Sequence, residues 1–129
     1  MLFIDTSFII GLTVNNDQWH DEALNLFPKV EKSKRYISNV IILETLNGLV
    51  DIMDGKEIEK MYHLLNNNYN VYMVDKEIQN KAINICKKYD GSLGYADCTS
   101  IAVMEELDIH EIVSFDEHFE NKDSIVRIH

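Results

Sequence analysis

The chain opens with a short run of large apolar residues that leads directly into a carboxylate. Leu2, Phe3 and Ile4 have no polar residue between them, and Asp5 follows at once. An unbroken apolar run of this length is typical of a strand buried on both faces, as in a parallel sheet covered by helices. Ligand sites of open α/β sheets lie at the carboxyl ends of the strands, so we expect Asp5 to lie at such a site.

Four more short segments predict strands, and apolar residues at helical spacing predict helices between most of them. The expected strands, including the first, are 2–4, 36–38, 69–74, 111–115 and 124–128. Strands separated by helices form a mainly parallel sheet with right-handed crossovers. We therefore predict a single α/β domain over residues 1–129, with three α/β/α layers and a mainly parallel central sheet of about five strands.

Two of the expected helices carry specific predictions. In residues 17–32 an apolar face is interrupted by Pro28, so a kink or an early end is expected there. Residues 40–50 are apolar nearly all round and should be largely buried. Glu44 lies in the middle of this second helix, where a carboxylate is costly unless it is paired, protonated or bound to a cation.

The charge balance argues against one simple class of protein. The chain has 12 Lys and Arg residues against 22 Asp and Glu residues, a formal net charge of −10, whereas simple nucleic-acid-binding modules are usually basic. Either the acidic residues form a solvated surface, or some of them gather where metal cations neutralise them. The positions of the acidic residues have to decide between these interpretations.

The sequence favours a cytoplasmic protein without a membrane partner. It contains no apolar run of the roughly 18 residues that a membrane-spanning helix needs. It also lacks the basic and apolar segments of a secretory signal at its N-terminus. Cys86 and Cys98 are expected to be buried, reduced thiols, with a disulfide or a metal pair as the alternative.

Three later acidic residues belong with Asp5. Glu44 lies in the apolar helix, Asp97 lies in or near the first turn of another apolar helix, and Asp116 directly follows the strand 111–115. Each has a structural alternative: Glu44 could reach an exposed stripe, Asp97 could interact with the helix dipole, and Asp116 could cap a turn. Because all four acids lie on elements of one sheet or on helices that pack against it, we expect them to meet in one cleft.

Such a cleft predicts metal-dependent chemistry. Four carboxylates would repel one another, and their ionised forms would persist only around a divalent cation. A set of oxygen ligands favours Mg²⁺ or Mn²⁺ over zinc, which prefers His or Cys. Waters on such an ion can attack or stabilise a phosphodiester, so hydrolysis of a nucleic-acid backbone is the predicted reaction class.

A dense basic cluster lies at residues 29–35. It is typical of a solvated helix end, where cations are favoured by the dipole. Contact with nucleic acid is the alternative, and Lys32, Lys34 and Arg35 are then the candidate residues. His118, just past the last of the four acids, could be a proton donor but is interpreted as a surface residue of a turn.

Four motifs in order along the whole chain resemble those of a known family. They are Phe3-Ile4-Asp5-Thr6-Ser7, Ile42-Leu43-Glu44, Tyr95-Ala96-Asp97 and Ser114-Phe115-Asp116-Glu117-His118-Phe119. The family is the PIN-domain nucleases, and within it the VapC-like toxins of prokaryotic toxin–antitoxin pairs. The first and last motifs are fairly specific, and the two central ones are weaker alone. One departure is Cys98-Thr99-Ser100, because many relatives have plain apolar residues after the third acid.

The resemblance implies a Mg²⁺- or Mn²⁺-dependent endoribonuclease with four catalytic acids, Asp5, Glu44, Asp97 and Asp116. Three of them would hold the metal, namely Asp5, Asp97 and Asp116, with Asp5 and Asp97 as principal ligands. Ser7 and Ser114 would support the site.

The resemblance also implies partners: an RNA substrate, a second copy in a homodimer, and a small antitoxin that occupies the active-site groove. Phe8 and Trp19 are candidate dimer contacts. A catalytically silent PIN-like binding module and a PIN nuclease of RNA processing are the alternatives. A phosphoacceptor domain would need a pair of acids after the first strand, and a haloacid-dehalogenase-like phosphatase would need an aspartate where Ser7 stands, so both are disfavoured.

Overall fold

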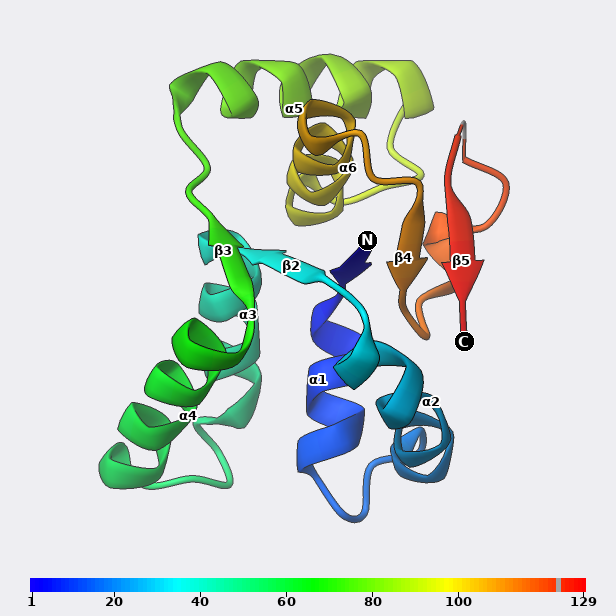
Figure 1. Cartoon of the computed structure of the whole chain (residues 1–129). Coiled ribbons are helices and arrows are strands. Elements are labelled where there is room, and N and C mark those ends of the chain that lie inside the picture. Colours follow the sequence, from blue (N-terminus) through cyan, green and yellow to red (C-terminus); the bar gives the residue numbers. More distant parts are fainter. Residues whose placement is uncertain (123) are drawn as a thin grey trace.

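The computed structural model describes residues 1–122 and 124–129, and its centre is a five-stranded sheet (Figure 1). The strands are β1 Leu2–Ile4, β2 Arg35–Ser38, β3 Asn70–Tyr72, β4 Glu111–Val113 and β5 Val126–Ile128. They are arranged in the order β3-β2-β1-β4-β5, and every neighbouring pair is parallel. The predicted fold class is confirmed, and the sheet is entirely rather than mainly parallel.

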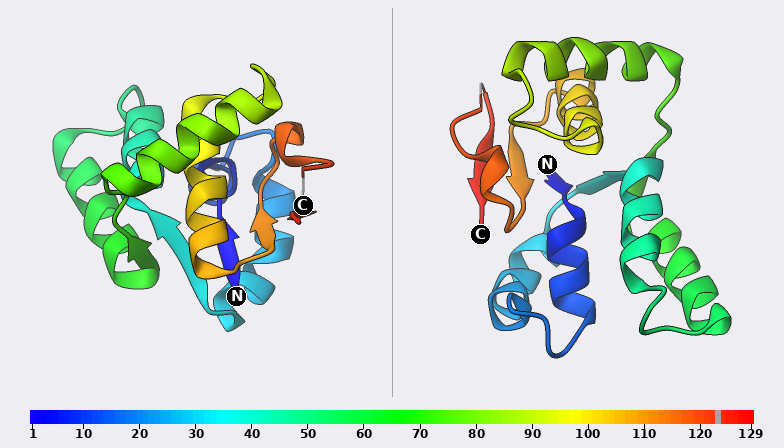
Figure 2. Two further views of the ribbon diagram at one scale, coloured as in Figure 1. Left: turned by 90° about the horizontal axis from the view of Figure 1, so that it is seen from above. Right: turned by 180° about the vertical axis from the view of Figure 1, so that it is seen from behind.

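Helices cover both faces of this sheet. They are α1 Thr6–Thr13, α2 His20–Lys32, α3 Asn39–Leu49, α4 Gly55–Asn68, α5 Lys76–Tyr89 and α6 Tyr95–Leu107, with a short 3₁₀ helix η1 Glu117–Phe119. Helices α1 to α4 lie on one side, and α5 and α6 lie on the other, as both views in Figures 1 and 2 show. The three predicted layers are therefore present.

The strand order places a topological switch beside β1. From β1 the chain moves to β2 on one side, and after β3 it returns through α5 and α6 to β4 on the other side. Ile4 is in register with Val113, so the residues that follow β1 and β4 emerge at the same edge. In open α/β sheets, ligands bind in the crevice that forms at the carboxyl ends of the strands beside such a switch.

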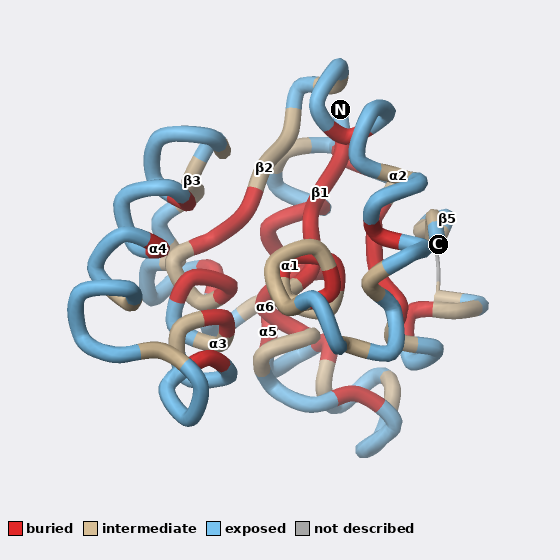
Figure 3. The backbone as a smooth tube through the Cα atoms, turned by 90° about the horizontal axis from the view of Figure 1, so that it is seen from below, coloured by how far each residue is buried: buried red, intermediate tan, exposed pale blue. Residues whose placement is uncertain are grey.

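The core confirms the reading of the first strand. Leu2, Phe3 and Ile4 are all buried, and Figure 3 shows buried backbone concentrated around β1 while α4 and α2 are largely exposed on their outer sides. Among the described residues, no helix is both long and apolar enough to cross a membrane.

Two helix predictions need correction. Helix α3 is less buried than expected, because Leu43 and Val50 are 59% and 56% exposed and only one side of the helix packs on the core. The early end expected at Pro28 is wrong, because Pro28 lies inside α2 and the helix continues to Lys32. Since Pro28 is exposed, water can satisfy the carbonyl that loses its hydrogen-bond partner to the proline.

Strand ends also differ from prediction. The fourth strand ends at Val113, so Asp116 lies in the turn beyond the strand rather than directly at its end. β3 and β5 are likewise shorter than the predicted segments 69–74 and 124–128, and Asp123 lies outside the described residues.

Candidate active site

Asp5 is fixed by two serine hydroxyls at the end of β1. It is 5% exposed, and its Oδ2 accepts hydrogen bonds of 2.7 Å from both Ser7 Oγ and Ser114 Oγ. The two hydroxyl oxygens in turn accept from backbone N–H groups, Ser7 from Phe115 at 3.0 Å and Ser114 from Asp116 at 3.0 Å. Each hydroxyl has one proton and donates it to Asp5. Hydrogen bonds therefore run from the backbone N–H groups through the two serine hydroxyls to the Asp5 carboxylate.

This network leaves one oxygen of Asp5 available. The backbone N–H of Ser7 also points to Oδ2, at 3.4 Å, where it caps α1. Within the described part of the chain, no group donates a hydrogen bond to Oδ1. Burial raises the pKa of Asp5, the bonds from Ser114 and Ser7 lower it, and the nearby charge of Asp116 raises it further. The carboxyl group is therefore fixed in place by hydrogen bonds. Burial and the charge of Asp116 disfavour its ionised form, and a bound cation would stabilise that form.

Glu44 reaches the same place from α3. Its Oε1 accepts a hydrogen bond of 3.3 Å from Thr6 Oγ1, at the start of α1. Partial burial raises the pKa of Glu44, and the charges of Asp5 and Asp116 raise it further. These charge interactions place Glu44 beside the other acids, so it does not simply extend along an exposed stripe.

Asp97 has a strongly raised pKa. It lies in the first turn of α6, where the helix dipole alone would lower the pKa of a carboxyl group. Instead, burial, together with the charges of Asp5, Asp116 and Glu44, raises its pKa to about 7. A helix-dipole role alone does not account for Asp97, because the surrounding negative charges and burial outweigh the dipole.

Asp116 caps η1 and also faces the acids. Its Oδ1 accepts the His118 backbone N–H at 2.9 Å and lies 3.0 Å from His118 Nδ1. The predicted turn-capping role is therefore correct. It does not exclude a site role, because Asp116 contributes to the raised pKa of each of the other three acids.

The prediction that His118 is a surface residue of a turn is confirmed, but the residue also lies close to two of the acids. Its side chain is 66% exposed, yet ligand atoms of Asp97, Asp116 and His118 all lie within 4.8 Å of one another, a spacing that could hold a metal ion. The available signal was its position two residues after Asp116, which a tight turn brings back to the capping carboxylate.

The donor set fits a divalent cation. Asp5, Glu44, Asp97 and Asp116 come from four different elements, and burial or mutual repulsion raises the pKa of the first three. Among the described residues of this cleft, the only cationic candidate is the imidazole of His118. Carboxylate oxygens gathered with so little positive charge are typical ligands of Mg²⁺ or Mn²⁺.

The basic cluster lies at the other edge of the sheet. Arg35 begins β2, and its Nη1 donates to the Glu31 carbonyl at 2.8 Å, at the end of α2. Lys32 and Lys34 precede it and are exposed. Because β2 is parallel to β1, these residues lie at the amino ends of the strands, and the structure does not bring them to the acids.

The two candidate dimer contacts, Phe8 and Trp19, differ in burial. Phe8 is fully buried, so it cannot contribute to a surface between two copies, and that prediction is wrong. Trp19 is 38% exposed and stacks on Phe115 with ring centroids 5.3 Å apart. Because α1 is apolar over most of its length, its sequence does not show which of its side chains are buried and which are exposed.

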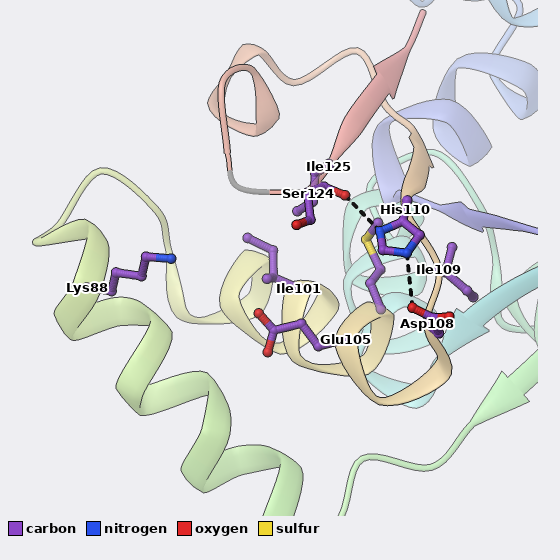
Figure 4. Close-up of a pocket in the computed structure, with 9 residues that line it drawn as sticks. Lys88, Ile101, Glu105, Asp108, Ile109, His110, Ser124 and Ile125 are labelled. Atoms are coloured by element: carbon purple, nitrogen blue, oxygen red, sulfur yellow. Dashed lines mark hydrogen bonds and ion pairs between the residues drawn. The ribbon is translucent and has the colours of Figure 1, made fainter.

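A cavity of about 360 Å³ lies away from the acids (Figure 4). It surrounds the turn before β4, where His110 Nδ1 lies 3.1 Å from the Ser124 carbonyl and His110 Nε2 lies 3.0 Å from Asp108 Oδ1. This turn is at the amino end of β4, whereas the acids lie at the carboxyl ends. His110 therefore connects two loops, and the cavity is not part of the acidic cleft.

Comparisons with known proteins agree with this fold. The PIN domain family model matches residues 2–125, whereas no curated protein matches the sequence. Among solved structures, the chain is similar to VapC20 of Mycobacterium tuberculosis, described as a toxin that cleaves the sarcin–ricin loop. The identity is 22%, the TM-score is 0.80, and 91% of each chain is covered.

Two further structures show the same fold. A toxin–antitoxin complex from Klebsiella pneumoniae is 15% identical with a TM-score of 0.76, covering 98% of this chain and 96% of that one. FitAcB from Neisseria gonorrhoeae is 13% identical with a TM-score of 0.70, covering 100% and 97%. At such identities the likeness concerns the fold, whereas the family model spans nearly the whole sequence, and on that ground the chain belongs to the PIN domain family.

Proposed function

We propose that this protein is a Mg²⁺- or Mn²⁺-dependent endoribonuclease and the toxin of a toxin–antitoxin pair. The observation that carries the proposal is the convergence of four carboxylates, with raised pKa values on three of them, at the switch point of the sheet. Membership of the PIN family favours nucleic-acid hydrolysis, and the neighbour described as an RNA-cleaving toxin favours RNA.

The environments of the four acids suit them to two different roles, metal binding and proton transfer. Asp5, Asp97 and Asp116 would hold the cation, and Asp5 is already oriented for this by Ser7 and Ser114. When bound, the cation would neutralise charge on the phosphate and make a coordinated water more acidic. Glu44, whose pKa is raised by burial and by the charge of Asp5, is suited to accept the proton that the attacking water loses, since a higher pKa makes a carboxylate a stronger base.

The test is cleavage of a mixed RNA pool by metal-free protein to which Mg²⁺ or Mn²⁺ is returned. The wild type is compared with Asp5→Asn and Asp97→Asn, with EDTA as the chemical control. Asp51→Asn is the matched control, because Asp51 is exposed and lies outside the cleft. We expect cutting by the wild type and by Asp51→Asn and its loss in the other two variants.

Three other results would change the conclusion. Cutting that survives both substitutions would mean that the acids are not the active site. A wild type that binds RNA or metal but cuts nothing would favour a catalytically silent PIN module. A cleaving enzyme whose expression does not slow cell growth would favour RNA processing over a toxin.

An antitoxin is proposed because one similar structure is described as a toxin–antitoxin complex, and two others as VapBC2 and VapBC bound to DNA. Besides the acidic cleft, an apolar groove of about 400 Å³ lies between α1, α2 and α4 and offers an anchor, with Phe27 and Leu64 on its exposed wall. Co-purification with the product of a small adjacent reading frame would test this. Leu64→Glu should abolish the complex while RNA cleavage persists, and a complex that tolerates this change would exclude the groove.

The homodimer stays a proposal with a different surface from the one expected. Leu43 of α3 and Met73, just after β3, are 59% and 66% exposed and line a shared hollow. Light scattering should give twice the chain mass for the wild type and one chain mass for Leu43→Glu. Ile83→Glu is the matched control, because Ile83 is 49% exposed on α5 and outside this surface. A monomeric wild type would refute the dimer.

A further inference from the structure

Helices α5 and α6 bring together the only two cysteines in the sequence. Cys86 lies near the end of α5 and Cys98 near the start of α6, and the two helices lie side by side in Figures 1 and 2. Cys86 Sγ donates to Cys98 Sγ across 2.7 Å. Non-bonded carbon atoms already settle about 3.5–4.0 Å apart, and a disulfide bond is about 2.05 Å long. The two thiols are free but closer than ordinary non-bonded contact.

The two sulfurs differ in accessibility. Cys98 is fully buried, whereas Cys86 is partly exposed. A reagent from solution can therefore reach Cys86, and Cys98 is reached through Cys86. Because only Cys86 is accessible from solution, Cys86 supplies the first attacking thiolate. This is the arrangement of an attacking and a resolving cysteine.

We propose that Cys86 and Cys98 form a reversible dithiol–disulfide site that exchanges with small-molecule disulfides such as oxidised glutathione. The Cys86 thiolate attacks one sulfur of glutathione disulfide, forming a mixed disulfide and releasing one glutathione thiolate. Cys98 loses its proton to that thiolate, and its sulfur attacks Cys86 Sγ and expels the second glutathione as a thiolate, which takes up the proton that Cys86 released to solvent at the start. Two protein thiols are oxidised, one small disulfide is reduced to two thiols, and no other reactant is needed.

The bond would tie the end of α5 to the first turn of α6. It closes the loop between residues 86 and 98, which restricts the unfolded chain and should raise the melting temperature by roughly 5–10 °C. The sulfurs need to approach by well under about 1 Å to reach bonding distance. Asp97 should therefore keep its place, and oxidation should stabilise the fold without dispersing the acids.

The test uses the full chain in EDTA, incubated for hours with graded ratios of oxidised to reduced glutathione. We expect an intact mass lower by two hydrogen atoms, loss of both thiols in a count under denaturing conditions, and reversal by dithiothreitol. The melting temperature should rise with the oxidised fraction. These readouts do not depend on RNA cleavage, so the site and the proposed nuclease activity can fail separately.

Cys86→Ser is the control, because a partly exposed cysteine tolerates serine; circular dichroism would verify its fold. This variant should gain no glutathione under the same conditions, since Cys98 is buried. Three results would overturn the proposal: a glutathione adduct on the wild type that persists without closing, a disulfide between two chains, or unchanged thiols at every ratio.

Discussion

Replacing Asp97 with asparagine should stabilise the metal-free protein. An acid whose pKa is higher in the folded than in the unfolded state destabilises the fold once it ionises. For Asp97 the pKa rises from 3.8 to about 7 on folding. The penalty is therefore absent below pH 3.8, grows between these two values, and is constant above pH 7. Asparagine has nearly the same shape and no charge, so it removes the penalty.

The magnitude follows from the size of that rise. At about 1.36 kcal/mol for each pH unit, the full rise corresponds to roughly 4 kcal/mol. The Asp97 side chain is only partly buried, and solvent screens such interactions, so we expect about 2 kcal/mol. In a domain of this size, that equals roughly 6–8 °C in melting temperature.

The assay is thermal unfolding in EDTA at pH 8 and near pH 4, with Asp51→Asn as a matched exposed control. Asp97→Asn should melt higher than the wild type at pH 8, nearly the same near pH 4, and should gain less than the wild type when Mn²⁺ is added. An equal gain at both pH values would show that charge is not the cause. No gain at pH 8 would refute the repulsion inferred from the cleft.

Three other substitutions test the packing and the site. Ser114→Ala should lower the free energy of unfolding by about 1–3 kcal/mol in a urea titration, because it leaves the Asp116 N–H without its acceptor; an unchanged midpoint would contradict the network. Phe8→Ala should cost about 3–5 kcal/mol because the side chain is fully buried, whereas Trp19→Ala should cost clearly less, and equal losses would argue against the burial difference. His118→Ala should weaken Mn²⁺ binding roughly tenfold in calorimetry, and unaltered affinity would remove His118 from the metal site.

The sequence predicted the fold and the meeting of the acids because both follow from the order of elements. An apolar strand that ends in Asp5, and another that leads to Asp116, must deliver both residues to one edge when the strands are parallel. The same rule, applied to the basic cluster, would have predicted its position away from the acids. Arg35 begins a strand, so it belongs to the opposite edge.

Side-chain burial on the helices could not be predicted in the same way. Leu43 and Phe8 are both large apolar residues in apolar helices, yet one is 59% exposed and the other is fully buried. Their exposure differs because one side chain points to a neighbouring element and the other does not. Which side of a helix is covered depends on contacts between segments far apart in sequence. The Cys86–Cys98 contact joins two helices across a turn, and helical periodicity alone gives no register between two helices.

Metal binding at the acidic cleft, as proposed above, would be coupled to folding. Asp5 cannot move away from its neighbours, because two hydroxyls and a helix N-terminus hold it, and Asp97 is fixed in the first turn of α6. The repulsion between them is therefore retained in the folded state until a cation arrives. A cation that binds only the folded protein would offset this repulsion and raise the free energy of unfolding. Because the repulsion grows as Asp97 ionises, the gain in melting temperature on adding Mn²⁺ should be larger at pH 8 than near pH 5, and a gain independent of pH would separate the metal from these acids.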